Sequence, residues 1–266
     1  MRRLALLLAI LASPATAHEL WIAAEDYTVA PQATVTAQIV NGSDYVGQNL
    51  PFLPQRFVRF DDVIGGTATP LPGRVGDLPA VQLPEAAEGL HVLVYESRDA
   101  TVDYKDWDTF VRFTEHKAFP GILQAHADRG LAEDPFREVY SRYSKALVAV
   151  GGGAGTDSRT GLETEIVALT NPYTDDVSGG MRFQLWYGDT PRADARFEVY
   201  DRSPDGAVTQ TFYQTDAQGM VTVPVQPGYT YMADAVLICE PEAALAQASG
   251  AVWETLWANI TWAIPG

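Results

Sequence analysis

The sequence predicts a mainly β protein with two β-sandwich domains, the second immunoglobulin-like or transthyretin-like, and a short helical insertion between them. Short segments in which polar and apolar residues alternate recur through most of the 266 residues, and Gly, Pro, Asn and Asp bound them. A stretch at 106–146 changes to helical spacing. A glycine-rich stretch at 151–160 follows it and is typical of a linker between domains.

The first part of the chain, residues 1–17, has the pattern of a signal peptide. Arg2 and Arg3 precede an apolar run from Leu4 to Ala12, and small residues at Ala15 to Ala17 match a signal-peptidase site. The apolar run is much shorter than the roughly 20 residues that a membrane-spanning helix needs. We therefore expect cleavage before His18, giving a soluble periplasmic protein that is not inserted in a membrane.

Charge, cysteine content and missing motifs exclude several classes of protein. The formal net charge of −16 disfavours a nucleic-acid partner, because nucleic-acid binding depends on Lys and Arg. The single cysteine, Cys239, leaves no internal disulfide, so an exported form must rely on its hydrophobic core. The sequence has neither a Gly-x-Ser-x-Gly elbow nor a Cys–His nucleophile arrangement, and we predict that the protein is not an enzyme.

Residues 18–150 are predicted to form the first β domain. Residues 33–40 alternate polar and apolar side chains and end at Asn41-Gly42, a strong turn signal. Further strands are expected at 56–60 and 89–96, where β-branched and apolar residues gather between turn signals.

The insertion within this domain is predicted to contain three helical pieces. Residues 106–117 place apolar side chains at helical spacing, with Asp106 or Asp108 as the N-cap. A second helix is expected from 120 to 129, because Pro favours the first turn and a glycine follows. Residues 136–143 carry an aromatic stripe that predicts a short helix or turn against a sheet, before a strand that ends at residue 150.

Residues 161–266 have the rhythm of a compact β-sandwich. Turn signals at Ser203 to Gly206 and Asp216 to Gly219 join neighbouring strands. We expect three tryptophans near the C-terminus to close the core of this domain. The predicted strands are 163–169, 181–187, 196–202, 208–214, 221–225, 229–238 and 259–263.

Several segments of the sequence resemble the DUF4198 family. They are HELWI from His18, GLHVLVYES from Gly89, FREVYSRYSKALVAVG from Phe136, LETEIVALTNPY from Leu162 and AVWETLWANITWAIP from Ala251. The resemblance covers essentially all of the chain after residue 17, in the same order. It implies an exported protein built of β-sandwich domains. Family members were formerly described as periplasmic components of nickel or cobalt uptake, which implies a membrane uptake system as a partner.

The predicted new N-terminus is the most specific chemical feature. A free α-amine and the imidazole of His18 can chelate a metal ion, and one further imidazole would complete a nitrogen-only site. Such a site suits copper(II) or, less well, nickel(II), and it resembles the histidine brace of copper proteins. His91 is the preferred partner, because its strand and the first strand are expected in one sheet. His116 comes next, and both His116 and His126 are expected to be exposed to solvent.

Three functions stay open from the sequence alone. The first is a periplasmic protein that handles copper, nickel or cobalt for an uptake system through His18, with His91 or His116. The second is a non-catalytic adaptor that binds a protein or glycan through its sandwich faces or loops. The third is a copper-dependent oxygenase that acts on polysaccharide, which would use the same N-terminal histidine.

Overall fold

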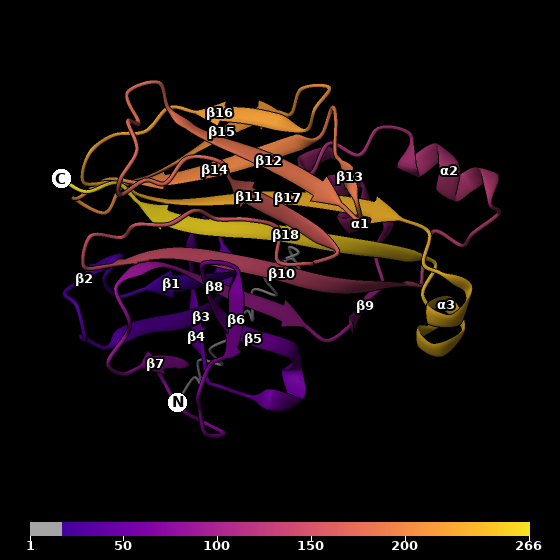
Figure 1. Ribbon diagram of the computed structural model, residues 1–266. Helices are drawn as coiled ribbons and strands as arrows, with labels where there is room; N and C mark the ends of the chain where they lie inside the picture. The colour runs from indigo at the N-terminus through magenta and orange to yellow at the C-terminus, as the bar shows by residue number, and fades with distance from the viewer. Residues whose placement is uncertain (1–17) are drawn as a thin grey trace, which may run out of the picture.

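The computed structural model describes residues 18–266 and shows a mainly β architecture, as the sequence predicted (Figure 1). Its strands form three sheets. The expected signal peptide, residues 1–17, lies outside the described residues. Across 18–266, no helix has both the length and the apolar character needed to cross a membrane.

A central sheet holds ten strands in the order β15-β14-β17-β18-β10-β8-β5-β6, with β2 and β9 also paired to β10. Its strands are β2 (Thr28–Val29), β5 (Phe57–Ile64), β6 (Thr67–Pro70), β8 (Gly89–Ser97), β9 (Ala100–Tyr104), β10 (Phe136–Val150), β14 (Arg196–Arg202), β15 (Val208–Gln214), β17 (Thr230–Cys239) and β18 (Trp253–Ala263).

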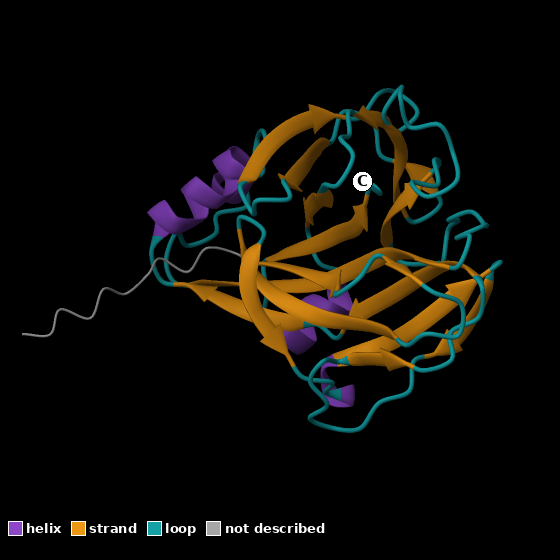
Figure 2. Ribbon diagram, turned by 90° about the vertical axis from the view of Figure 1, so that its left-hand side faces the viewer, coloured by secondary structure: helices purple, strands orange, loops and turns teal. Residues whose placement is uncertain are grey.

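Two smaller sheets cover the central one on opposite faces, and Figure 2 shows the strands stacked in layers. One contains β1 (Glu19–Ala24), β3 (Val35–Ser43), β4 (Val46–Leu50) and β7 (Val81–Leu83). The other contains β11 (Thr164–Ala168), β12 (Met181–Tyr187), β13 (Thr190–Pro191) and β16 (Met220–Val223).

Both faces of the central sheet are buried, because each forms a core with one of the outer sheets. Strand β8 shows this: Val92 and Val94 enter the core under β11 and β12, whereas Leu93 and Tyr95 enter the core under β1 and β3. This division follows from the alternation of side chains along a strand. The molecule therefore contains two sandwiches that share their middle layer.

The shared layer joins the two halves of the chain. Strand β10 from the first half and β18 from the second pair in parallel, with Glu138 opposite Trp253 and Ala146 opposite Thr261. The two domains expected at 18–150 and 161–266 thus contribute strands to one sheet.

The prediction of a helix or turn at 136–143 is wrong, because these residues begin the strand β10. Strands that are buried on both faces lose the polar–apolar alternation of a half-buried strand. Phe136 contacts the helices and Tyr143 lies in a core between sheets, so both faces of β10 carry aromatic residues. Their spacing imitates a helical stripe.

The segment 151–160 is held along its length and does not form the free linker that its glycines predicted. The carbonyl of Ala154 accepts a hydrogen bond from the Leu90 backbone (2.9 Å), and the amide of Asn171 donates to Gly153 and Gly155. Asp157 is buried and accepts from the ammonium of Lys145 at 2.8 Å. The segment is therefore part of the folded body.

Helices α1 and α2 pack against one end of the central sheet, over residues of β9, β10, β17 and β18. Asp106 caps the first helix, as predicted, and accepts from the backbone of Asp108. Trp253 and Trp257 pack under the helices, while Trp262 lies in the core between the sheets, on the other face of β18. The helical elements are a 3₁₀ turn (Pro54–Arg56), α1 (Trp107–His116), α2 (Ile122–Asp128) and α3 (Ala243–Ser249).

Candidate metal site at the start of strand β1

Strand β1 begins at Glu19, directly after His18, and its first residues are fixed from both sides. The amide of Asn41 on β3 donates to the Glu19 carbonyl at 3.1 Å. The guanidinium of Arg142 on β10 donates to the His18 carbonyl at 2.6 Å. The start of β1 is therefore held between its neighbour β3 in the outer sheet and β10 in the central sheet.

The side chain of Glu19 points into a buried charged cluster that we call the acidic cluster: Glu19, Lys117, Glu198 and Asp234. The ammonium of Lys117, at the C-terminal end of α1, lies 3.1 Å from Glu19, 2.9 Å from Glu198 and 3.2 Å from Asp234. Glu198 on β14 and Asp234 on β17 are directly opposite each other in the sheet. All four side chains are almost fully buried.

The acidic cluster holds three carboxyl groups and only one ammonium. Burial raises the pKa of Glu19 to about 7, and Lys117 opposes this rise. Burial likewise raises the pKa of Glu198. For Lys117, burial alone would lower the pKa, but the surrounding carboxylates raise it, so the ammonium stays charged. Among the described residues, Oε2 of Glu19 and Oδ1 of Asp234 are buried without a hydrogen-bond partner.

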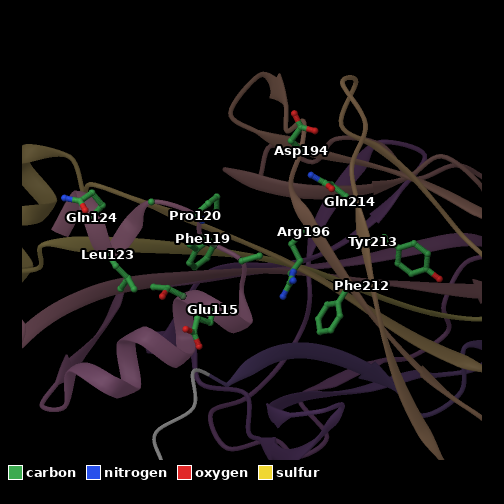
Figure 3. Close-up of a pocket in the computed structure, with 13 residues that line it drawn as sticks. Glu115, Phe119, Pro120, Leu123, Gln124, Asp194, Arg196, Phe212, Tyr213 and Gln214 are labelled. Carbon is green, nitrogen blue, oxygen red and sulfur yellow. The ribbon is translucent and has the colours of Figure 1, made fainter. Parts of the chain in front are cut away.

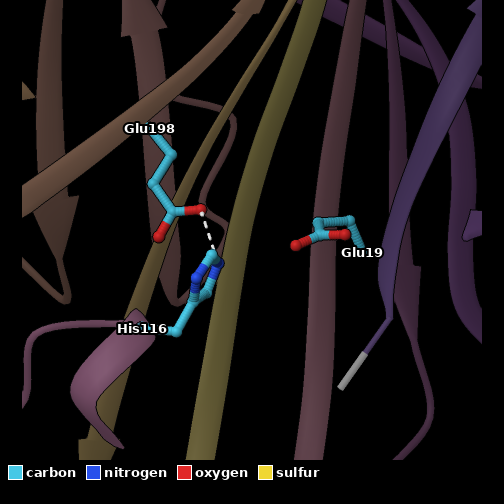
Figure 4. A group of neighbouring side chains, drawn as sticks. All are labelled: Glu19, His116 and Glu198. Carbon is cyan, nitrogen blue, oxygen red and sulfur yellow. Dashed lines mark ion pairs between the residues drawn. The ribbon is translucent and has the colours of Figure 1, made fainter. Parts of the chain in front are cut away.

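His116, the last residue of α1, reaches the acidic cluster from the solvent side (Figure 4). Its Nε2 lies 3.7 Å from Oε2 of Glu198, and its side chain is 46% exposed. Burial, followed by the charges of Lys117 and Arg196, lowers the pKa of His116. The imidazole is therefore neutral at neutral pH and has a lone pair to offer.

Glu19, His116 and Glu198 each offer one donor atom within 4.8 Å of the others. Metal–nitrogen and metal–oxygen bonds of roughly 2.0–2.2 Å place donors about 3–4 Å apart, so these side chains would close by about 1 Å on a metal ion. One imidazole with carboxylates suits copper(II), nickel(II), cobalt(II) and zinc(II). A divalent ion would also neutralise the surplus of buried carboxylate.

His91 has a structural role that competes with metal binding. Its Nδ1 lies 2.9 Å from Asp62 Oδ2, and its Nε2 lies 2.8 Å from the Ala87 carbonyl. Burial alone would lower the pKa of His91, but these hydrogen bonds raise it. A protonated ring that donates through both nitrogens has no free lone pair.

The expectation that the strand of His91 and the first strand share a sheet is wrong, because β8 is in the central sheet and β1 in an outer one. Order along the chain does not reveal which strands pair, and β1 pairs with β3. The structure therefore favours His116 over His91 as a metal ligand.

The expectation that His126 is exposed is also wrong. This side chain is buried under α2, where its Nδ1 accepts from the indole of Trp253 and its Nε2 donates to the Ala132 carbonyl, both at 3.0 Å. Aromatic residues from α1, β10 and β18 surround this ring and bury it, which the sequence pattern did not reveal.

The side chain of His18 lies on the other side of β1 from that of Glu19. His18 and Leu20 line a separate hollow, whereas Glu19 points to Lys117, as the alternation of side chains along a strand requires. The structure thus brings together His116, Glu19 and Glu198, and the chelate through His18 stays a prediction.

Sequence reasoning missed the carboxylates of this site. Glu19, Glu198 and Asp234 each stand within a strand of otherwise buried residues. A charged residue inside an apolar strand is the signal that could have found them, because buried charges need a partner.

A large open hollow of about 920 Å³ lies beside the site, between the α1–α2 connection and strands β14 and β15 (Figure 3). Arg196 lines it, with its guanidinium 4.5 Å from the ring centre of Phe212. The centre of the His116 ring lies 6.2 Å from the centre of the Phe212 ring. The exposed edge of His116 is therefore next to this hollow.

Comparisons with known proteins give one strong match. A family model described as "Domain of unknown function (DUF4198)" matches residues 15–238. No curated protein matches the chain.

Two solved structures are similar over most of the chain, each at 12% identity. One is the tetra-tandem repeat in the extending region of a large adhesion protein, with a TM-score of 0.22; the match covers 92% of this chain and 49% of that one, about half of its length. The other is the D0-D1 domain of intimin, with a TM-score of 0.23; the match covers 91% of this chain and 97% of that one.

Proposed function

The chain belongs to the DUF4198 family, and we propose that it is an exported binding protein that holds a divalent transition metal at Glu19, His116 and Glu198. The observation that carries the proposal is a surplus of buried carboxylate beside a neutral imidazole. Export rests on the sequence pattern before His18.

The charge balance of the acidic cluster supports a cation as its ligand. Lys117 neutralises one of three carboxyl groups, and the buried Oε2 of Glu19 has no partner among residues 18–266. Buried carboxylates without a counter-charge are costly, so a divalent ion would stabilise the folded protein.

The proposed site is also placed for metal exchange. His116 is half exposed and lies beside an open hollow, which gives a metal ion and a receiving protein access to one ligand. Cleavage before His18 would add a free α-amine one residue from Glu19. This arrangement suits delivery of copper, nickel or cobalt to a membrane uptake system, and it needs no catalytic group.

Calorimetric titration of the processed chain, starting at His18, with copper(II) and with nickel(II) tests the proposal. We expect His116→Ala and Glu198→Gln to weaken the affinity by about tenfold or more, since each removes one ligand. Glu115→Gln is the matched control, because Glu115 is exposed next to His116 and lies outside the acidic cluster.

Two results would overturn this assignment. One is a dissociation constant for the wild-type chain no tighter than millimolar. The other is loss of binding in His18→Ala together with unchanged binding in His116→Ala, which would place the metal on the N-terminal chelate instead.

One observation favours the adaptor role as a second candidate. Phe212 is 46% exposed on β15, which is an edge strand of the central sheet, and it lies beside the large hollow. Edge strands can accept a further strand from a peptide partner. A ligand from a peptide library that binds wild type without metal, but not Phe212→Ser, would favour this role over metal binding.

A further inference from the structure

A second hollow of about 580 Å³ lies on the opposite side of β1 from the acidic cluster. Residues of β1, β9, β10 and β18 line it, and its size is in the range of small-molecule sites. It uses no side chain of the proposed metal site, so a ligand bound in it would be independent of the proposed function.

Three cationic side chains line this hollow: Arg56, Lys105 and Arg142. None of them forms a salt bridge with another residue in 18–266. The exposed carboxylates in the same lining are each paired with an arginine outside it: Asp103 with Arg137 at 2.6 Å and Asp106 with Arg112 at 3.7 Å. The hollow is therefore locally positive in a chain with a net charge of −16. Such a local excess of positive charge attracts anions.

Arg142 is the best-placed of these cations. Its guanidinium lies 4.4 Å from the ring centre of Tyr140 and 5.6 Å from that of Trp257. One terminal nitrogen donates to the His18 carbonyl, and Nε is buried without a partner among the described residues. A buried N–H without an acceptor is unfavourable, and a carboxylate oxygen would satisfy it.

Glu138 lies at the base of the same hollow and adds little repulsion toward an anion. It is fully buried and accepts hydrogen bonds from Tyr104 (3.0 Å) and Thr255 (2.5 Å). Burial raises its pKa to about 7, so it carries a proton in mildly acidic surroundings.

We infer that this hollow binds a small organic carboxylate. The carboxylate of the ligand would accept hydrogen bonds from the guanidinium of Arg142, and Arg56 and Lys105 would add positive charge at the rim of the hollow. The apolar part of the ligand would lie against Tyr140 and Trp257.

Titration with benzoate, in the presence of EDTA, tests the inference without any contribution from metal. Benzamide is the matched neutral ligand of the same shape. We expect benzoate to bind at least about tenfold more tightly than benzamide. Equal binding of the two, or no binding of benzoate up to about 10 mM, would overturn the inference.

Variants locate the binding. Arg142→Gln should abolish benzoate binding, and the double variant Arg56→Gln/Lys105→Gln should weaken it by about 3- to 10-fold. Arg74→Gln, an exposed arginine outside the hollow, is the control and should bind as wild type does.

Arg142 also holds the start of β1, so its replacement can disturb folding. The double variant Arg56→Gln/Lys105→Gln changes two exposed side chains and therefore tests the inference in a folded protein. Unchanged affinity in the folded double variant would contradict the role of positive charge. His116→Ala should bind benzoate normally, which separates this site from the metal site.

Discussion

The ammonium of Lys117 lies 2.9 Å from Oε2 of Glu198, and this contact joins the C-terminal end of α1 to strand β14. Both side chains are buried, and Glu19 and Asp234 approach the same ammonium from two further strands. A single lysine therefore connects one helix to two of the three sheets.

Replacing Lys117 by methionine should destabilise the protein strongly. The change leaves three buried carboxyl groups without a counter-charge, and breaking a buried ion pair in this way costs about 3–5 kcal/mol of unfolding free energy. Urea denaturation at pH 7 without metal measures the loss. Lys105→Met, at an exposed lysine, is the control; a loss as small as that of the control would refute this role of Lys117.

Glu138 should make the protein less stable as the pH rises. Burial raises its pKa from 4.5 to about 7, against the opposing hydrogen bonds from Thr255 and Tyr104. The folded protein then holds this proton more tightly than the unfolded chain, so the free energy of unfolding falls between pH 4.5 and about 7.

Glu138→Gln should remove up to about 3 kcal/mol of this pH dependence. Urea denaturation at pH 5 and pH 8 tests it, with Glu25→Gln as the exposed control. If the free energy of unfolding changed equally between pH 5 and pH 8 in wild type and in Glu138→Gln, the expectation would be contradicted.

The buried pair of His91 and Asp62 should be visible in an NMR titration. Because hydrogen bonds to Asp62 and Ala87 outweigh burial, the pKa of His91 lies above 6.5. The pair therefore adds stability that is fully present below pH 6.5 and is lost as the pH rises through the raised pKa. Asp62→Asn should lower the pKa of His91 while that of His116 stays unchanged. An unchanged His91 titration would show that the carboxylate does not hold its proton.

The glycine-rich segment 151–160 should resist trypsin at Arg159. Asp157 accepts from Lys145 and from the backbone of Ser158 and Ala168, which holds the peptide in place. Asp157→Ala should expose the segment, and mass spectrometry should then detect cleavage after Arg159. Asp176→Ala, at an exposed turn, should leave the digestion pattern unchanged; rapid cleavage of wild type would show that the segment is a free linker.

Nickel affinity should decrease as the pH falls from about 8 to 6. The pKa of Glu19 is about 7, so a proton competes with the metal for this carboxylate. One competing proton weakens the affinity by up to about tenfold per pH unit below the pKa. Calorimetry at several pH values measures the slope, and Glu19→Gln should flatten it while weakening the affinity at pH 8.

Much of the fold could be predicted from local pattern. The strands Met181–Tyr187, Arg196–Arg202 and Val208–Gln214 have the predicted bounds, because alternation and turn residues act over a few positions. The turn at Asp216 to Gly219 is also confirmed, since Gly219 has a φ of +70° and a side chain there would meet the Leu185 carbonyl. Pairing between distant strands, such as β10 and β18, has no comparable local signal.

The candidate site was harder to predict than the strands, because it also depends on contacts between distant parts of the chain. Glu19, Glu198 and Asp234 are far apart in the sequence, and only the register of three strands and one helix brings them to Lys117. His116 was named among the candidates because histidines are few. Its neighbours depend on tertiary structure, and so does the burial of His91 and His126.

The parallel pairing of β10 with β18 also sets the order in which the chain can be completed. The hydroxyl of Thr255 on β18 donates to Glu138 on β10 across 117 positions, and β18 is synthesised after β10. Until it arrives, the long edge of β10 presents unpaired backbone groups that invite association with other chains. The first half of the protein therefore depends on β18 for a closed edge, and a chain without β18 would leave that edge open to other chains.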